Sequence, residues 1–143
     1  MSGIYKQDNW SLSKCSLNDQ EIFIRMRDAL PSATDRELYS NLILVSWTYS
    51  TGPSGLPTAD TAQLMQDFEN AVESALESKG FGVLAACITG NGKKEWRYYT
   101  SDKDEFMARF NSGLKNHPAY PIRLQVFADP QWSALAELLA RRA

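Results

Sequence analysis

The chain has 143 residues, of which 43% are hydrophobic and 11% aromatic, and its formal net charge is −2 at pH 7. This length predicts one folded domain over residues 1–143 that needs no metal or disulfide to hold its core, and the composition excludes an intrinsically disordered chain. The slightly acidic balance gives no general attraction to nucleic acid or to an anionic membrane.

The N-terminal half is predicted to contribute two strands joined by a connection. In residues 21–27 the side chains alternate between two faces, which is typical of a half-buried strand. One face carries Ile22, Ile24 and Met26, and the other carries Phe23, Arg25 and Arg27. Residues 33–39 predict a turn of helix within the connection, and residues 42–50 predict a central strand that is apolar on both faces at its start.

A long amphipathic helix is predicted after the Gly- and Pro-rich loop at residues 51–60, with Thr58 or Asp60 as its N-cap. Its apolar stripe, with spacings of three and four, consists of Leu64, Met65, Phe68, Ala71, Val72, Ala75 and Leu76. Gly80 follows as a left-handed terminating residue. The outer face is expected to carry Glu69, Glu73 and Glu77, either as a solvated surface or as an acidic surface that binds a partner.

The C-terminal half predicts a hairpin, a helix, a strand and a final helix. Residues 81–89 and 95–100 are the hairpin strands, joined by the tight-turn pair Asn91-Gly92. Ser101 or Asp102 is expected to cap the next helix, and residues 122–127 form another strand. Asp129 followed by Pro130 at the first helical position predicts the start of the final helix.

This order predicts an α+β fold. From residue 42 onward it reads β-α-β-β-α-β, which is the ferredoxin-like order of an antiparallel sheet with two helices packed on one face. The strand at residues 21–27 is then an extra N-terminal strand whose place in the sheet the pattern does not give, and the C-terminal helix is a further addition.

The segment TGNGKKEWRYYTSD, residues 89–102, raises the question of nucleic-acid or phosphate binding. Its glycines lead from strand to strand rather than into a helix, and it lacks P-loop spacing, which excludes a phosphate cradle of that type. Exposed aromatic and basic side chains on such a sheet can bind RNA, and the candidates are Lys93, Lys94, Trp96, Arg97 and Tyr99. The RNA-binding strand signature is absent, so a plain β-hairpin is the favoured interpretation.

No catalytic or metal-binding motif stands out. The single histidine, His117, follows a helix and precedes a proline, where a helix-end role is expected. Neither cysteine forms part of a C-x-x-C motif, and Cys87 lies in an apolar run that predicts a buried thiol, with a Cys15–Cys87 disulfide left open. We therefore expect no catalytic residue, no metal and no cofactor, although an enzyme that pairs distant carboxylates stays open.

The C-terminal half resembles a bacterial family known as domain of unknown function 695. The residues that carry the likeness are Gly92, Trp96, Tyr98, Tyr99, Tyr120, Asp129, Pro130 and Trp132. The resemblance extends over residues 10–140, and the aliphatic segment after Trp132 departs from it, because family members often have an aromatic residue there. The family has no established activity, so the resemblance implies no catalytic residue. Some members are joined to a domain like regulator of ribonuclease activity B, which implies a protein-binding role by analogy.

These observations favour a non-catalytic interaction or regulatory domain whose partner is another protein. One alternative is an immunity or inhibitor protein that neutralises a toxin or nuclease through Glu69, Glu73 and Glu77. A second is nucleic-acid binding through residues 89–102. The N-terminus lacks a signal-peptide core, and no apolar run reaches the roughly 18–20 residues of a membrane helix, so we expect a cytoplasmic protein that does not bind membranes; the oligomeric state is not predicted.

Overall fold

The computed structural model describes residues 5, 9–17, 20–50 and 54–141. In these residues it contains six strands and four α-helices. In chain order the elements are β1 (Trp10–Leu17), β2 (Gln20–Arg27), α1 (Ala33–Leu38), β3 (Asn41–Thr48), α2 (Ala59–Ala75), a 3₁₀ turn (Glu77–Lys79), β4 (Val83–Gly90), β5 (Lys93–Thr100), α3 (Lys103–Gly113), β6 (Ile122–Ala128) and α4 (Ser133–Arg141). The predicted α+β class is confirmed.

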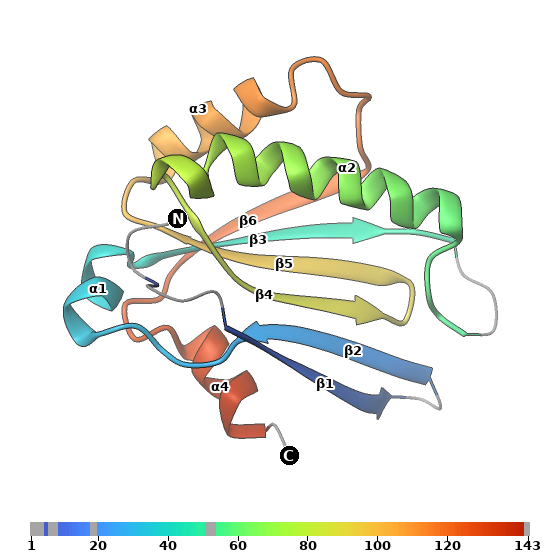
Figure 1. Ribbon diagram of the computed structural model, residues 1–143, viewed down its shortest axis with the longest axis horizontal. Coiled ribbons are helices and arrows are strands. Elements are labelled where there is room, and N and C mark those ends of the chain that lie inside the picture. The colour runs from blue at the N-terminus through green and yellow to red at the C-terminus, as the bar shows by residue number, and fades with distance from the viewer. Residues whose placement is uncertain (1–4, 6–8, 18–19, 51–53, 142–143) are drawn as a thin grey trace.

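The strands form one antiparallel sheet in the order β1-β2-β4-β5-β3-β6 (Figure 1). The extra N-terminal strand of the sequence is β2, and it pairs with β4. The sequence did not predict β1, which pairs with β2 along its whole length and becomes one edge of the sheet. The sheet therefore differs from the expected one, because a two-stranded extension lies beyond β4.

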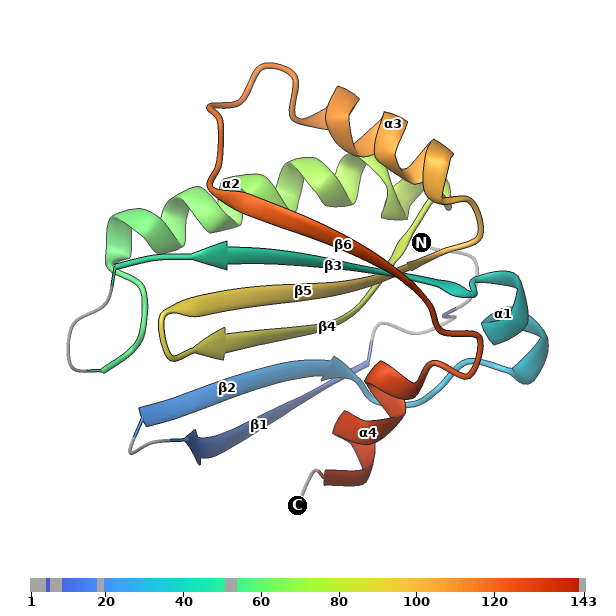
Figure 2. The ribbon, with the colours of Figure 1, turned by 180° about the vertical axis from the view of Figure 1, so that it is seen from behind.

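The first face of the sheet is covered by α2 and α3, which lie together in both views (Figures 1 and 2). Their buried side chains, which include Phe68 and Phe106, pack on Val45, Trp96 and Tyr98 of β3 and β5. Trp96 and Tyr98 both point to this face, because alternate residues of a strand share one side of the sheet. Aromatic contacts such as Phe68–Trp96, with ring centroids 4.9 Å apart, make this the larger of the two cores.

The opposite face is covered by α4, so the helices are not confined to one face. Trp132 is fully buried, and its ring stacks on Tyr99 with centroids 3.8 Å apart and planes 6° from parallel. Its Nε1 donates a hydrogen bond to the Tyr39 carbonyl at 2.9 Å. This aromatic pair attaches the C-terminal helix to the centre of the sheet.

Of the three helix starts predicted from capping residues, two are confirmed. Thr58 caps α2 by accepting from the Thr61 N–H, and Asp102 caps α3 by accepting from Asp104 and Glu105. The predicted start of the final helix is wrong, because α4 begins at Ser133. Asp129 caps it through the Ser133 and Ala134 N–H groups, across an intervening turn that ends at Trp132 with a φ of 57°.

The hairpin between β4 and β5 turns as predicted. Asn91 and Gly92 have φ values of 54° and 80°, and such positive values favour the Asn-Gly pair in a tight turn. Gly90 is also required, because a Cβ there would come within 2.6 Å of the Glu21 carbonyl oxygen on β2. The turn residues thus allow the N-terminal strands to approach β4 closely. Among the helices of the described residues, none is long and apolar enough to cross a membrane.

Candidate functional site

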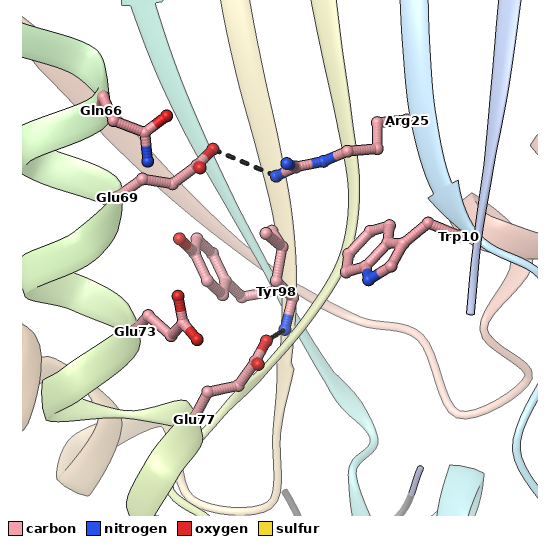
Figure 3. A pocket seen from close by; sticks show the side chains of 8 residues that line it. Trp10, Arg25, Gln66, Glu69, Glu73, Glu77 and Tyr98 are labelled. Atoms are coloured by element: carbon pink, nitrogen blue, oxygen red, sulfur yellow. Dashed lines mark hydrogen bonds and ion pairs between the residues drawn. The ribbon is translucent and has the colours of Figure 1, made fainter. Parts of the chain in front are cut away.

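A pocket of about 220 Å³ lies in the corner between α2 and the β1–β2 extension. It is lined by Trp10, Arg25, Gln66, Glu69, Glu73, Glu77, Leu84 and Tyr98. Figure 3 shows the acidic side chains on the helical wall, Arg25 and Trp10 on the strand wall, and Tyr98 between them. The pocket forms because α2 rises from the sheet while β2 and β1 continue the sheet past it.

The acidic wall comes from a four-residue spacing along α2 and the 3₁₀ turn that follows it. Glu69, Glu73 and Glu77 stand one helical turn apart and therefore share one side of the helix. The sequence predicted this side to be the outer face, which is wrong for two of the three. The side chains of Glu69 and Glu77 are only 13% and 18% exposed, because both turn toward the strands.

Glu69 is the most heavily engaged residue of this wall. Its Oε1 accepts a hydrogen bond from Nε1 of the fully buried Trp96 at 2.7 Å. The same oxygen lies 3.3 Å from Nη2 of Arg25 and 3.7 Å from Nζ of Lys94. The Glu69 carboxylate therefore satisfies the Trp96 indole in the core and links α2 to β2 and β5.

Glu77 makes an equivalent link from the 3₁₀ turn that follows α2. Its Oε1 accepts from the Leu84 N–H at 2.7 Å and lies 3.4 Å from Nη2 of Arg27. Arg27 is 2% exposed, and its Nε donates to the Leu84 carbonyl at 3.0 Å. This buried arginine therefore has both a carboxylate and a backbone partner, as buried charges require.

The opposite wall is built from Trp10 and Arg25, which lie on neighbouring strands. The guanidinium carbons of Arg25 and Arg27 lie 5.0 and 4.3 Å from the centroid of the Trp10 ring. Cation–π contacts of this kind stabilise both the ring and the cations. Trp10 and Tyr98 did not emerge from the sequence as site residues; the only signal for Trp10 was an aromatic residue in a serine-rich segment.

Burial shifts the pocket residue Tyr98 and the nearby Cys87 toward their protonated forms. Burial raises the pKa of Tyr98 well above its usual range, and the nearby Cys87, Glu69 and Glu77 raise it further. Burial also raises the pKa of the Cys87 thiol to about 11, against the opposing effect of Arg25. Both groups are therefore neutral near pH 7, and Cys87 is not poised as a thiolate nucleophile.

An exposed apolar surface adjoins the pocket on the same face of the extension. Leu12 pairs with Arg25 and Lys14 with Phe23 across β1 and β2, so these side chains point to the same side as Trp10. Leu12 is 82% exposed and Phe23 is 39% exposed. We refer to Leu12 and Phe23 as the β1–β2 apolar surface.

The five nucleic-acid candidates do not form an open aromatic and basic surface. Trp96 and Tyr99 are fully buried, on opposite faces of the sheet. Lys94 pairs with Glu69, and Arg97 contacts Glu95 and donates to the Ala134 carbonyl at 2.7 Å. Lys93 is the exposed member. The two rings cannot stack on bases without opening a core.

The remaining candidates from the sequence are the histidine and the two cysteines. His117 Nδ1 is 2.8 Å from the Tyr120 hydroxyl, beyond the end of α3. Cys15 is exposed and Cys87 buried, and both are free thiols, so the disulfide left open by the sequence does not form. Within the described residues, no group of three or more His, Cys, Asp or Glu side chains could hold a metal ion.

The comparison with known proteins agrees with the resemblance seen in the sequence. A family model described as a family of unknown function, DUF695, matches residues 8–140. No curated protein matches the chain. The match includes all six strands, the residues that line the pocket and the Tyr99–Trp132 pair. The chain therefore belongs to the DUF695 family, for which no function is established.

Proposed function

We propose that this chain is a non-catalytic protein-interaction domain that binds a partner protein over the pocket and the β1–β2 apolar surface. The observation that carries the proposal is the exposure of Leu12 and Phe23, at 82% and 39%, directly beside a pocket. Large apolar side chains grouped at the surface are typical of binding sites. Interfaces characteristically have an apolar centre with a polar rim.

The surroundings of this surface supply such a rim. Lys14 and Glu21 form an ion pair at 3.6 Å on the β1–β2 extension, with side chains 60% and 53% exposed. On the other side stand the exposed residues Gln66 and Glu73 of α2. A partner that covers Leu12 and Phe23 would therefore meet both positive and negative side chains at its margin. Complementary charges there would fix the orientation of the bound partner.

A binding role is supported over a catalytic one by the state of the polar groups. Glu69 and Glu77 are already held by ion pairs and hydrogen bonds, so neither is free to transfer a proton. His117 lines a separate depression with Tyr120 and is not brought to the pocket. We place this role in the cytoplasm, as the sequence led us to expect.

The two alternatives have less support. An inhibitor that captures a basic toxin or nuclease would rely on the acidic wall, and two of its three carboxylates are engaged within the chain. Nucleic-acid binding would rely on Trp96 and Tyr99, which are buried. We also infer that β3 to β6 with α2 and α3 are related to a ferredoxin-like unit, because β5 lies between β3 and β4, and β6 lies beside β3.

The test is affinity capture from nuclease-treated lysate of the cell that encodes the protein, with matched surface variants. Leu12→Ser and Phe23→Ser are expected to lose the captured partner. Phe127→Ser is the control, because Phe127 on β6 is 46% exposed and lies at the opposite edge of the sheet. All three variants should keep the wild-type urea midpoint. A partner that is lost only with Phe127→Ser would move the interface to β6, and capture of no protein would contradict an interaction role.

A further inference from the structure

The Tyr98 hydroxyl faces the pocket and has no hydrogen-bond partner among the described residues. Tyr98 is 3% exposed, and its side chain lines the pocket between α2 and the strand wall (Figure 3). Among the residues that the structure describes, none makes a hydrogen bond to this hydroxyl. The side chain is buried while its hydroxyl oxygen faces the pocket, so a group that enters the pocket can hydrogen-bond this oxygen.

Glu73 is a carboxylate of the acidic wall that the described part of the chain does not pair. Glu69 is paired with Arg25, and Glu77 with Arg27. Glu73 stands one turn from each and makes no ion pair or side-chain hydrogen bond with any described residue. The four charged side chains that line the pocket are three glutamates and Arg25, so the lining is acidic.

The volume restricts what can enter. Pockets for drug-sized ligands and cofactors occupy about 300–1,000 Å³. At about 220 Å³ this pocket is smaller and suits a single side chain. A positively charged one would donate hydrogen bonds both to the Glu73 carboxylate and to the Tyr98 oxygen, and its aliphatic stem could lie along the Trp10 ring.

We propose that the pocket binds one lysine or arginine side chain of the partner protein, with its cation held between Glu73 and the Tyr98 hydroxyl. This assignment rests on the proposed function, since the partner supplies the side chain. It also gives the interface a geometry, in which a basic anchor enters the pocket while apolar residues cover Leu12 and Phe23. Anchor side chains that fill a pocket commonly dominate binding energy.

The binding test uses three blocked tripeptides that differ in the middle residue: acetyl-Gly-Arg-Gly-amide, its lysine equivalent, and its citrulline equivalent. Citrulline keeps the shape of arginine and removes the charge. In ¹H–¹⁵N correlation spectra, the arginine or lysine peptide is expected to shift the Trp10 indole N–H and the Glu73 amide in a saturable manner. The citrulline peptide is expected to bind about tenfold more weakly or worse.

Variants separate the two contacts. Glu73→Gln is expected to weaken binding of the cationic peptide by about tenfold because it removes the negative charge, and Tyr98→Phe by about fivefold because it removes the hydroxyl acceptor. Tyr98→Phe should leave the urea midpoint unchanged or raised, since the hydroxyl has no partner to lose. Glu137→Gln is the matched control, because Glu137 is an exposed glutamate on α4, which covers the opposite face.

Three results would overturn the assignment: equal binding of the citrulline peptide, no effect of Glu73→Gln, or no saturable shift with either cationic peptide. Tighter binding of free spermidine than of both peptides would also overturn it, in favour of a small polyamine. The proposed function is tested separately by Leu12→Ser and Phe23→Ser. A partner that is lost with those variants but retained with Glu73→Gln supports the interaction role and refutes the basic anchor.

Discussion

Replacing Glu69 by alanine is expected to lower the free energy of unfolding by about 2–4 kcal/mol. The largest part comes from Trp96, whose fully buried indole N–H would lose its acceptor at 2.7 Å, and an unsatisfied buried donor costs about 1–3 kcal/mol. Arg25 and Lys94 lose an ion-pair partner, but their side chains are 40% and 22% exposed, so each pair adds only about 0–1 kcal/mol.

The assay is urea unfolding followed by far-ultraviolet circular dichroism and tryptophan fluorescence, together with a thermal scan. For a chain of this size, each kcal/mol lowers the Tm by about 3–5 °C, so Glu69→Ala should lower it by about 6–20 °C. Glu73→Ala is the internal control, because it makes the same change in helix propensity one turn along α2 without an ion pair to lose. Its effect should stay within about 0.5 kcal/mol.

A double-mutant cycle with Trp96→Phe isolates the hydrogen bond from the ion pairs. If the indole and the carboxylate are coupled as the 2.7 Å distance indicates, the interaction energy should be about 1 kcal/mol or more. Equal destabilisation by Glu69→Ala and Glu73→Ala, or additive effects in the cycle, would refute the inward placement of Glu69. The carboxylate would then belong to the solvent-facing surface that the sequence suggested.

Three further outcomes follow from the caps, the thiols and the aromatic pair. With a disulfide reagent at pH 8, Cys15 should react in the native protein and Cys87 only in denaturant, because burial raises the pKa of Cys87 to about 11. Rapid reaction of both thiols in the native protein would contradict the burial of Cys87. Trp132→Ala should lower the free energy of unfolding in urea by about 3–5 kcal/mol, since it removes a fully buried ring stacked on Tyr99. A decrease below about 1 kcal/mol would mean that α4 does not pack as described. Asp102→Ala should cost about 0.5–2 kcal/mol by the same measurement, through loss of the cap on α3, whereas an unchanged midpoint would exclude that cap.

The local chemistry of the sequence was sufficient for most elements. The stripe of α2, the Thr58 and Asp102 caps, the left-handed Gly80 and the Asn91-Gly92 turn are each determined by a few neighbouring residues. Such signals survive folding because they satisfy backbone groups locally. The order of elements followed from them, and with it the α+β class.

The errors occurred where distant residues decide the outcome. β1 was missed because serine and lysine separate its few apolar residues, and it forms through pairing with β2 rather than through propensity. The start of α4 was misplaced because Asp129 has a second role, accepting from the Tyr99 hydroxyl at 2.6 Å. That contact and the burial of Trp132 hold the chain in a turn before the helix can begin.

The pocket could not be predicted from residue spacing alone, because it combines the residue spacing of a helix with that of a strand. Three glutamates at four-residue intervals span about 12 Å along α2 and the 3₁₀ turn after it, whereas Arg25 and Arg27 stand about 6.7 Å apart on a strand. Because the two arginines stand closer together than the three glutamates, they cannot pair with all three carboxylates. The Trp96 and Leu84 N–H groups hold the two outer carboxylates against the sheet, and the arginines pair with those two. Within the residues that the structure describes, Glu73 is left in the middle without a cation, and the addition of β1 and β2 to the sheet therefore creates both the pocket and its unmatched charge.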